Sequence, residues 1–174
     1  MRLSDEFFRR DAKTVAVELL GKELVRHFDN TYTLRLIINE TEAYVGEHDL
    51  ACHASKGRTR RTEPMFLVGG ILYIYLVYGM HFMLNVVTGA ENSAEAVLIR
   101  GAGEISGPGK LTKALAVDAS FNCESLISSE RIYINETALL PSYITTPRIG
   151  IDYAGEFWKS QPLRFVTVPT HLKR

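Results

Sequence analysis

The spacing of apolar residues predicts a helix near the beginning of the chain. Between residues 12 and 20, apolar side chains recur at the i, i+3, i+4 spacing that places them on one helix face: Ala12, Val15, Ala16, Leu19 and Leu20. Asp11 stands where a helix N-cap is expected, and Gly21 stands where helices commonly stop. We therefore expect a helix from residue 12 whose apolar stripe faces the core.

Strands are predicted to follow this helix. Residues 23–28 and 32–45 read as two strands, joined through Asp29 and Asn30, a pair of residues typical of turns. Strands are also predicted near the end of the chain, at residues 132–134 and 163–168. A further helix is expected to begin near Pro108 and to run to about residue 116, because proline is favoured in the first turn of a helix.

The most unusual segment covers residues 64–90, which contain no Asp, Glu, Lys or Arg. The segment is nevertheless polar at several points: Tyr73, Tyr75, Tyr78, His81 and Asn85. A membrane span is a poor interpretation, because Gly69, Gly70 and Gly79 divide the segment into pieces of strand length and Asn85 would lie deep in lipid. No membrane contact is therefore expected.

A β-hairpin explains this segment better. Residues 71–77 and 81–87 are rich in aromatic and β-branched side chains, and residues 78–80 are suited to a turn. If the turn centres on Gly79, Tyr73 lies opposite Asn85 and both point to the same face of the hairpin. Ordinary core packing is the more common role for aromatic residues in general, so that interpretation of the rings stays open.

Together these elements indicate an α+β fold. A chain of 174 residues is long enough for one substantial core, and no second domain is visible. Strands outnumber helices without a regular βαβ alternation. We expect a single mixed domain over residues 1–174, with a curved, largely antiparallel sheet, flanking helices and a protruding β-hairpin.

Composition and charge add two expectations. The hydrophobic fraction of 46% and the charged fraction of 23% are ordinary for a globular protein, so disorder is not expected. Cys52 and Cys123 stand alone, and no apolar signal-peptide core follows Met1, so we expect a reducing intracellular compartment.

The charged residues are unevenly distributed, although the formal net charge is zero. An acidic segment is followed at once by a basic one: Glu40, Glu42, Glu47 and Asp49, then Lys56, Arg58, Arg60 and Arg61. Such a layout suits an acidic site beside a basic rim that holds phosphate, and it also suits a solvated loop. Lys110 and Lys113 at the start of the predicted helix are further candidates for a phosphate contact.

The strand at residues 32–45 carries the first candidate for catalysis. Its even-numbered face is apolar at first and then continues as Glu40, Glu42 and Tyr44. A carboxylate that is half buried beside an aromatic ring has a raised pKa, which suits a general base. The alternative is that the strand reaches solvent there and that its glutamates are surface residues.

Other chemistries find little support. His48, Asp49, Cys52 and His53 include a His-x4-His spacing but no established ligand pattern, so no metal is expected. His53 is compatible with a ligand, an acid-base group or an ordinary hydrogen-bonding residue. The chain contains no P-loop, no dinucleotide fingerprint and no Gly-x-Ser-x-Gly elbow.

An ordered series of short blocks resembles the alkyladenine DNA glycosylase family, also called the mammalian-type 3-methyladenine DNA glycosylases. The blocks run almost from end to end: ETEAY (40–44), ACHAS (51–55), RRTEPMF (60–66), LYIYLVYG (72–79), LNV (84–86), VLIR (97–100), GPGKL (107–111), RIG (148–150) and PLRF (162–165). The resemblance implies a DNA-repair hydrolase that flips a damaged purine out of the duplex and cuts its N-glycosidic bond. It also implies one mixed domain and no cofactor.

The resemblance also implies roles for individual residues. Glu42 matches the general base that activates water, and Arg100 matches the arginine that holds this water together with the backbone near Ile149. Three residues match those that enclose the flipped base: Tyr44, His53 and Tyr75. Two more match residues of the hairpin: Tyr78, a wedge that enters the vacated stack, and Asn85, a pocket residue that disfavours guanine.

Some positions depart from the family or match no role. Tyr73 is assigned to packing in the core. Between Arg100 and Gly107 the chain is shorter than many family members, and His81 stands where an aromatic residue is common.

The partner implied by these residues is double-stranded DNA that contains damaged purines, bound by a monomer. Because no matched motif supplies an amine nucleophile, we expect a monofunctional glycosylase that leaves an abasic site. Two rival functions remain: a non-catalytic module that stacks nucleic acid on the tyrosine hairpin, and a hydrolase of free nucleosides.

Overall fold

The computed structural model describes residues 1–29, 31–139 and 141–168 of the chain. Its α-helices are α1 (Asp5–Phe8), α2 (Ala12–Glu18), α3 (Pro108–Ala114) and α4 (Gly155–Ser160). Short 3-10 helices are η1 (His53–Lys56), η2 (Glu63–Phe66), η3 (Ala119–Phe121) and η4 (Asp152–Ala154). The strands are β1 (Glu23–Phe28), β2 (Tyr32–Val45), β3 (Leu72–Val77), β4 (His81–Thr88), β5 (Glu95–Ala102), β6 (Ile105–Ser106), β7 (Ile132–Asn135), β8 (Tyr143–Thr146) and β9 (Arg164–Thr167).

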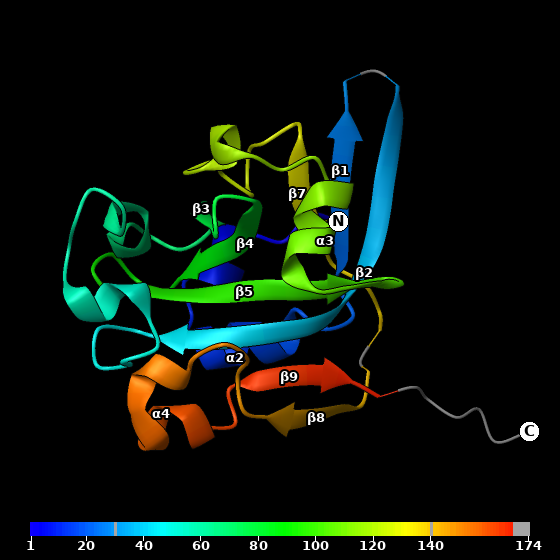
Figure 1. The fold of residues 1–174 in the computed structure, drawn as a ribbon. Helices are drawn as coiled ribbons and strands as arrows, with labels where there is room; N and C mark the ends of the chain where they lie inside the picture. Colours follow the sequence, from blue (N-terminus) through cyan, green and yellow to red (C-terminus); the bar gives the residue numbers. More distant parts are fainter. Residues whose placement is uncertain (30, 140, 169–174) are drawn as a thin grey trace, which may run out of the picture.

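The strands of the described residues form one nine-stranded sheet. Its main path runs in the order β3-β4-β5-β2-β1-β7, with β6 beside β5, β9 beside β2 and β8 beside β9. All of these pairs are antiparallel. In Figure 1 the long strand β2 bends away from β5 and rises into a hairpin with β1. The expected α+β class with a curved, antiparallel sheet is confirmed.

Helices cover the sheet near the bend of β2. Helix α2 contacts β2 and β5, and α3 contacts β4 and β5, so both helices pack against the central strands of the sheet (Figure 1). The predicted cap is present, since the Asp11 carboxylate accepts a hydrogen bond from the Thr14 N–H at 2.9 Å. The largest fully buried side chains belong to one core cluster: Phe8, Leu19, Leu24, Ile38, Leu72, Leu84, Ile99, Leu111, Leu115, Phe121, Leu126 and Phe165.

The segment at residues 64–90 contains the predicted hairpin, formed by β3 and β4. Tyr73 pairs with Asn85 and Val77 with His81, so the turn is centred on Gly79 as expected. None of the helices in the described parts of the chain is long and apolar enough to cross a bilayer. Because residues 72–77 and 81–88 are paired strands, the segment forms the predicted hairpin.

The predicted turn between β1 and β2 includes Asn30, which lies outside the described residues. The two strands themselves, and the later ones at β7 and β9, lie where the sequence predicts them. The sequence does not predict strands β5, β6 and β8, helices α1 and α4, or the 3-10 helices. Of these, β5 matters most, because it lies between β4 and β2 in the sheet.

Candidate active site

A cleft lies between the β3–β4 hairpin, strand β5 and the segment that leads into η4. Its outer part measures about 440 Å³, and the residues that line it include Tyr75, Tyr78, Leu98, Arg100 and Ile149. An inner cavity of about 30 Å³ adjoins it. The two spaces share four lining residues: Tyr44, His53, Tyr75 and Tyr153. The fold thus brings the residues implied by the family resemblance into one place.

The Glu42 carboxylate is fully buried, and both of its oxygens are held by residues that line this cleft. Oε1 accepts a hydrogen bond from the Ile149 N–H at 2.8 Å and lies 3.4 Å from Arg100 Nη1. Oε2 accepts a hydrogen bond from the Tyr44 hydroxyl at 2.9 Å. Burial raises the pKa of Glu42, and Arg100, Ile149 and Tyr44 counter only part of this effect. A carboxylate with a raised pKa is a stronger proton acceptor, which suits general-base chemistry.

Arg100 reaches the cleft because it occupies an irregular position of the sheet. Glu40 pairs with Gly101 and Thr41 with Ile99, so Arg100 is the extra residue of a β-bulge. Bulges commonly redirect a side chain at a functional site. Arg100 Nε donates to Glu40 Oε1 at 2.9 Å, and its Nη1 faces Glu42.

Glu40 completes this charged group. Its Oε1 also accepts a hydrogen bond from Arg164 Nε of β9 at 2.7 Å, so one carboxylate holds two arginines. Glu40 and Glu42 are both buried. The alternative in which the glutamates of this strand are surface residues is therefore wrong.

Aromatic rings form the wall of the cleft. The ring centroids of His53 and Tyr75 lie 4.5 Å apart, and those of Tyr73 and Tyr75 lie 5.3 Å apart. Burial, together with the charges of Arg61 and Lys56, lowers the pKa of His53 to about 4, so the imidazole is neutral at pH 7. A wall of phenols and a neutral imidazole can accept a cationic ring without charge repulsion.

Asn85 closes the inner cavity from β4. Its Nδ2 donates to the Tyr73 backbone carbonyl at 3.1 Å, which fixes the plane of the amide. The Tyr73 hydroxyl is hydrogen-bonded to His53 Nδ1 at 3.0 Å, and Tyr73 lines the same cavity. Tyr73, which the sequence assigns to core packing, is therefore also a wall residue of the cavity.

Residues in the segment with the His-x4-His spacing contact different partners instead of facing one common point. Asp49 pairs with Arg148, the His53 ring contacts Tyr73, and the Cys52 thiol faces the Ala94 carbonyl at 3.8 Å. Within residues 1–29, 31–139 and 141–168, no three His, Cys, Asp or Glu side chains are grouped as a metal ion would need.

The model of the family described as Methylpurine-DNA glycosylase (MPG) matches residues 6–106 and 102–170. The chain belongs to this family. The two matched segments overlap at residues 102–106, and together they cover residues 6–170. Membership of the methylpurine-DNA glycosylase family makes the chain a DNA glycosylase, an enzyme that hydrolyses N-glycosyl bonds, and makes DNA its partner.

Similar proteins cover nearly the whole chain. A protein of Legionella pneumophila (strain Corby) named "Putative 3-methyladenine DNA glycosylase" is 44% identical over 173 residues, which cover 94% of this chain and 93% of that protein. Proteins with the same name from Natranaerobius thermophilus and Rickettsia rickettsii (strain Sheila Smith) are 40% and 45% identical. These alignments cover 90% and 86% of this chain, and 91% and 82% of the relatives.

The six basic residues predicted to contact phosphate are all exposed, but they are not equivalent: Lys56, Arg58, Arg60, Arg61, Lys110 and Lys113. The Arg58 guanidinium is occupied by Glu63, with contacts of 2.7 and 2.8 Å, and by Asn92. The Arg61 Cζ lies 5.4 Å from the centroid of the Tyr75 ring, at the edge of the cleft. Lys56 and Arg61 also line a neighbouring cavity of about 310 Å³.

Sequence reasoning missed two parts of the site besides Tyr73. Tyr153 lines both spaces of the cleft, and its hydroxyl donates to the Ala51 carbonyl at 2.9 Å. No local pattern marks this residue, because it lies in a three-residue helix. The second omission is the Asp49–Arg148 pair, whose partners lie far apart along the chain.

Proposed function

We propose that this DNA glycosylase removes alkylated purines from duplex DNA, with a water molecule activated by Glu42. The single observation that supports this best is the Glu42 carboxylate, which is buried, has a raised pKa and contacts Arg100, a residue that lines the aromatic cleft. The proposal covers residues 1–174 as one glycosylase domain.

The reaction needs one proton acceptor and one positioned water. The water oxygen bonds to C1′ of the sugar while the C1′–N bond breaks, and the purine leaves with the bonding electrons. Glu42 accepts the proton that the water loses, and Arg100 with the Ile149 N–H would hold this water near C1′. Hydrogen bonds around a catalytic group commonly rearrange when substrate binds, so the water would take over contacts that these donors now make to Glu42.

Base flipping explains why the cleft is aromatic. A base inside a duplex cannot reach a catalytic side chain, and its extrusion costs a few kcal/mol, less for a poorly paired base. The purine would enter the outer cleft between Tyr44, His53 and Tyr75, with its edge toward the inner cavity. Arg61 and Arg148 lie over the rings of Tyr75 and Tyr44, which draws electron density from them. We therefore expect these rings to favour a cationic base over a neutral one by only about 0.5 kcal/mol, near the low end of cation–π energies.

The product is expected to be an abasic site with an intact strand. No lysine is among the described residues that line the outer cleft, so no amine is at hand to attack C1′. We propose that a monomer is active. We also propose that it works inside the cell, with the chromosomal DNA.

Base release from duplex oligonucleotides tests the proposed function. Each duplex would carry one 3-methyladenine, 7-methylguanine, hypoxanthine or 1,N6-ethenoadenine, and the free base and the abasic strand would be quantified. Release from at least one lesion with no strand cleavage is the expected outcome. Binding without any release would favour the stacking module, and equal turnover of free nucleosides would favour a nucleoside hydrolase.

Asn85 is proposed to disfavour guanine, because a fixed amide at the inner cavity would crowd the exocyclic amine of that base. Replacement by Ala should raise release of 7-methylguanine relative to hypoxanthine, by about 10-fold if one steric contact is removed. The ratio of the two release rates is the measurement. An unchanged ratio would remove Asn85 from selectivity.

Lys56, Arg60 and Arg61 are proposed to contact DNA phosphates, together with Lys110 and Lys113. The triple change of the first three residues to Ala should reduce the slope of log K against log salt by about one unit for each phosphate that is no longer neutralised. Arg35→Ala is the matched control, because Arg35 is exposed and pairs with Glu23 on the β1–β2 hairpin. Arg58 is expected to contribute less to phosphate binding, because its guanidinium is already paired with Glu63. If the triple variant kept the full slope, this loop would face away from DNA.

A further inference from the structure

Arg148 and Asp49 form a fully buried ion pair next to the cleft. Arg148 Nη1 and Nη2 donate to the two Asp49 oxygens at 2.5 and 2.9 Å, and neither side chain is exposed. Such a pair contributes little net stability, because the loss of hydration offsets the attraction. Arg148 Nε, moreover, has no hydrogen-bond partner among the described residues. A buried polar atom without a partner calls for an explanation.

Arg148 is connected to two of the three groups that hold the Glu42 carboxylate, the Ile149 N–H and the Tyr44 hydroxyl. Its Nη1 also donates at 2.9 Å to the carbonyl of Ala43, the residue after Glu42 on β2. The next residue along the chain is Ile149, whose N–H donates to Glu42 Oε1. The Arg148 Cζ lies 4.7 Å from the centroid of the Tyr44 ring, and the Tyr44 hydroxyl donates to Glu42 Oε2.

We propose that Arg148 is a positioning residue for the Glu42 carboxylate and fixes two of its donors, the Ile149 N–H at Oε1 and the Tyr44 hydroxyl at Oε2. Ile149 belongs to no helix or strand, so side-chain contacts must hold its N–H against β2. The Ala43 carbonyl and the Asp49 carboxylate provide that anchor through Arg148. A guanidinium over the Tyr44 ring withdraws electron density, which makes the phenol a stronger hydrogen-bond donor.

This inference rests on the proposed function, because it concerns the residue proposed as the general base. The other titratable and charged groups around Glu42 come from all neighbouring elements: Tyr44 on β2, Tyr75 on β3, Arg100 on β5, Tyr153 on η4, and Glu40, which shares Arg100. Substitution of Arg148 changes none of these residues. Since Arg148 and the Ile149 N–H both lower the pKa of Glu42, their loss raises it.

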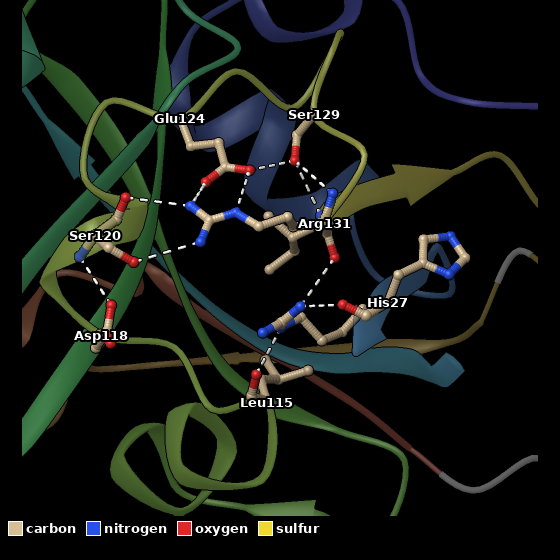
Figure 2. Close-up of polar contacts among 9 residues, drawn as sticks. His27, Leu115, Asp118, Ser120, Glu124, Ser129 and Arg131 are labelled. Carbon is tan, nitrogen blue, oxygen red and sulfur yellow. Dashed lines mark hydrogen bonds and ion pairs between the residues drawn. The ribbon is translucent and has the colours of Figure 1, made fainter. Parts of the chain in front are cut away.

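Two variants separate the charge of Arg148 from its geometry. Arg148→Met removes the positive charge and the hydrogen bonds. Arg148→Lys keeps a positive charge beside Asp49 but cannot make the bidentate contact. Arg26→Met is the matched control for loss of a buried arginine. Arg26 donates to the Leu115 carbonyl at 2.8 Å and lies 4.4 Å from the Phe28 ring centroid. Figure 2 shows the polar contacts near Arg26, around Arg131 and Glu124. None of the residues labelled in Figure 2 lines the cleft.

Two measurements decide the role of Arg148. One is single-turnover base release as a function of pH, and the other is an NMR titration of the Glu42 side-chain carboxyl carbon. In both Arg148 variants we expect the rate to fall about 10- to 100-fold, as for a misplaced catalytic group, with unchanged binding of lesion DNA. The acidic limb of the profile and the Glu42 titration should both move to higher pH, further for Met than for Lys. Arg26→Met should move neither.

Two results would overturn the proposal. It is overturned if the Glu42 titration stays at its wild-type position in Arg148→Lys, or if the rate loss equals that of Arg26→Met. Should Arg148→Met fail to fold, Arg148→Lys alone carries the test. If the wild type releases no base, the proposed function fails, whereas the Glu42 titration still decides whether Arg148 positions this carboxylate.

Discussion

Replacement of Glu42 by Gln is expected to lower single-turnover base release by about 100- to 10,000-fold, the range typical of a lost general base. The amide has nearly the same shape, so it can still accept the Ile149 N–H, but it cannot take a proton from water. Binding of lesion DNA should change little. Rates measured with enzyme in excess over a duplex that carries hypoxanthine, together with Kd from fluorescence anisotropy, would check both expectations.

The size of the rate loss in Glu42→Gln should depend on which lesion the duplex carries. An N7-alkylated purine is cationic and leaves more readily than neutral hypoxanthine, so it depends less on an activated water. We therefore expect Glu42→Gln to impair hypoxanthine release more than 7-methylguanine release. Glu40→Gln is the matched control, because Glu40 lies on the same strand and contacts Arg100 without holding the proposed water. A larger loss for Glu40→Gln than for Glu42→Gln would reassign the base.

The pH dependence of the wild-type enzyme follows from the same carboxylate. Glu42 acts as a base only when it is ionised, so activity is lost as the pH falls through its pKa in the folded protein. Burial raises that pKa, and the loss therefore begins at a higher pH than for an exposed glutamate.

The parts of the fold that sequence alone predicts are those with local signatures. The β3–β4 hairpin is uncharged, has β-forming residues on both sides of Gly79, and pairs Tyr73 with Asn85 as its length requires. The α2 helix has a cap at Asp11 and an apolar stripe. In each case neighbours within about a dozen residues determine the structure.

The missed elements lack such signatures. Strand β5 is buried between two other strands, so its apolar run has no alternation and resembles a short piece of buried helix. Helix α4 buries none of its residues, so it has no apolar stripe to detect. The bulge that aims Arg100 depends on how β5 pairs with β2, which no local pattern encodes.

Most of the site depends on contacts between distant residues. The Ile149 N–H and the Glu42 carboxylate are separated by 107 positions, and Arg148 and Asp49 by 99. The acidic strand indicates that Glu42 is a candidate base, but periodicity cannot say which backbone segment will hold it. The roles of Arg100 and Ile149 came from the family resemblance, and the Asp49–Arg148 pair became visible only in the fold.

Tyr78→Ala is expected to weaken damage-specific binding by about 1 to 3 kcal/mol, or about 5- to 150-fold in Kd. Tyr78 lies at the tip of the β3–β4 hairpin, where its side chain is 89% exposed and its φ is +52°. A bulky residue seldom adopts such a φ, and an exposed ring gains nothing for the core. In the gap left by a flipped base, by contrast, the ring can replace lost stacking. The ratio of Kd for lesion-containing and undamaged duplexes is the measurement.

Two further variants show whether stacking is the cause. Tyr78→Phe keeps the ring and should behave almost as the wild type, because no hydroxyl contact is needed between stacked bases. Tyr32→Ala removes another exposed tyrosine, at the start of β2, where it stacks on Phe28 with ring centroids 4.4 Å apart. It should leave the ratio unchanged, because the ring is already occupied and lies on a different hairpin. Equal effects of Tyr78→Ala and Tyr32→Ala would show that neither ring acts as a wedge. The hairpin would then contribute only the walls of the cleft.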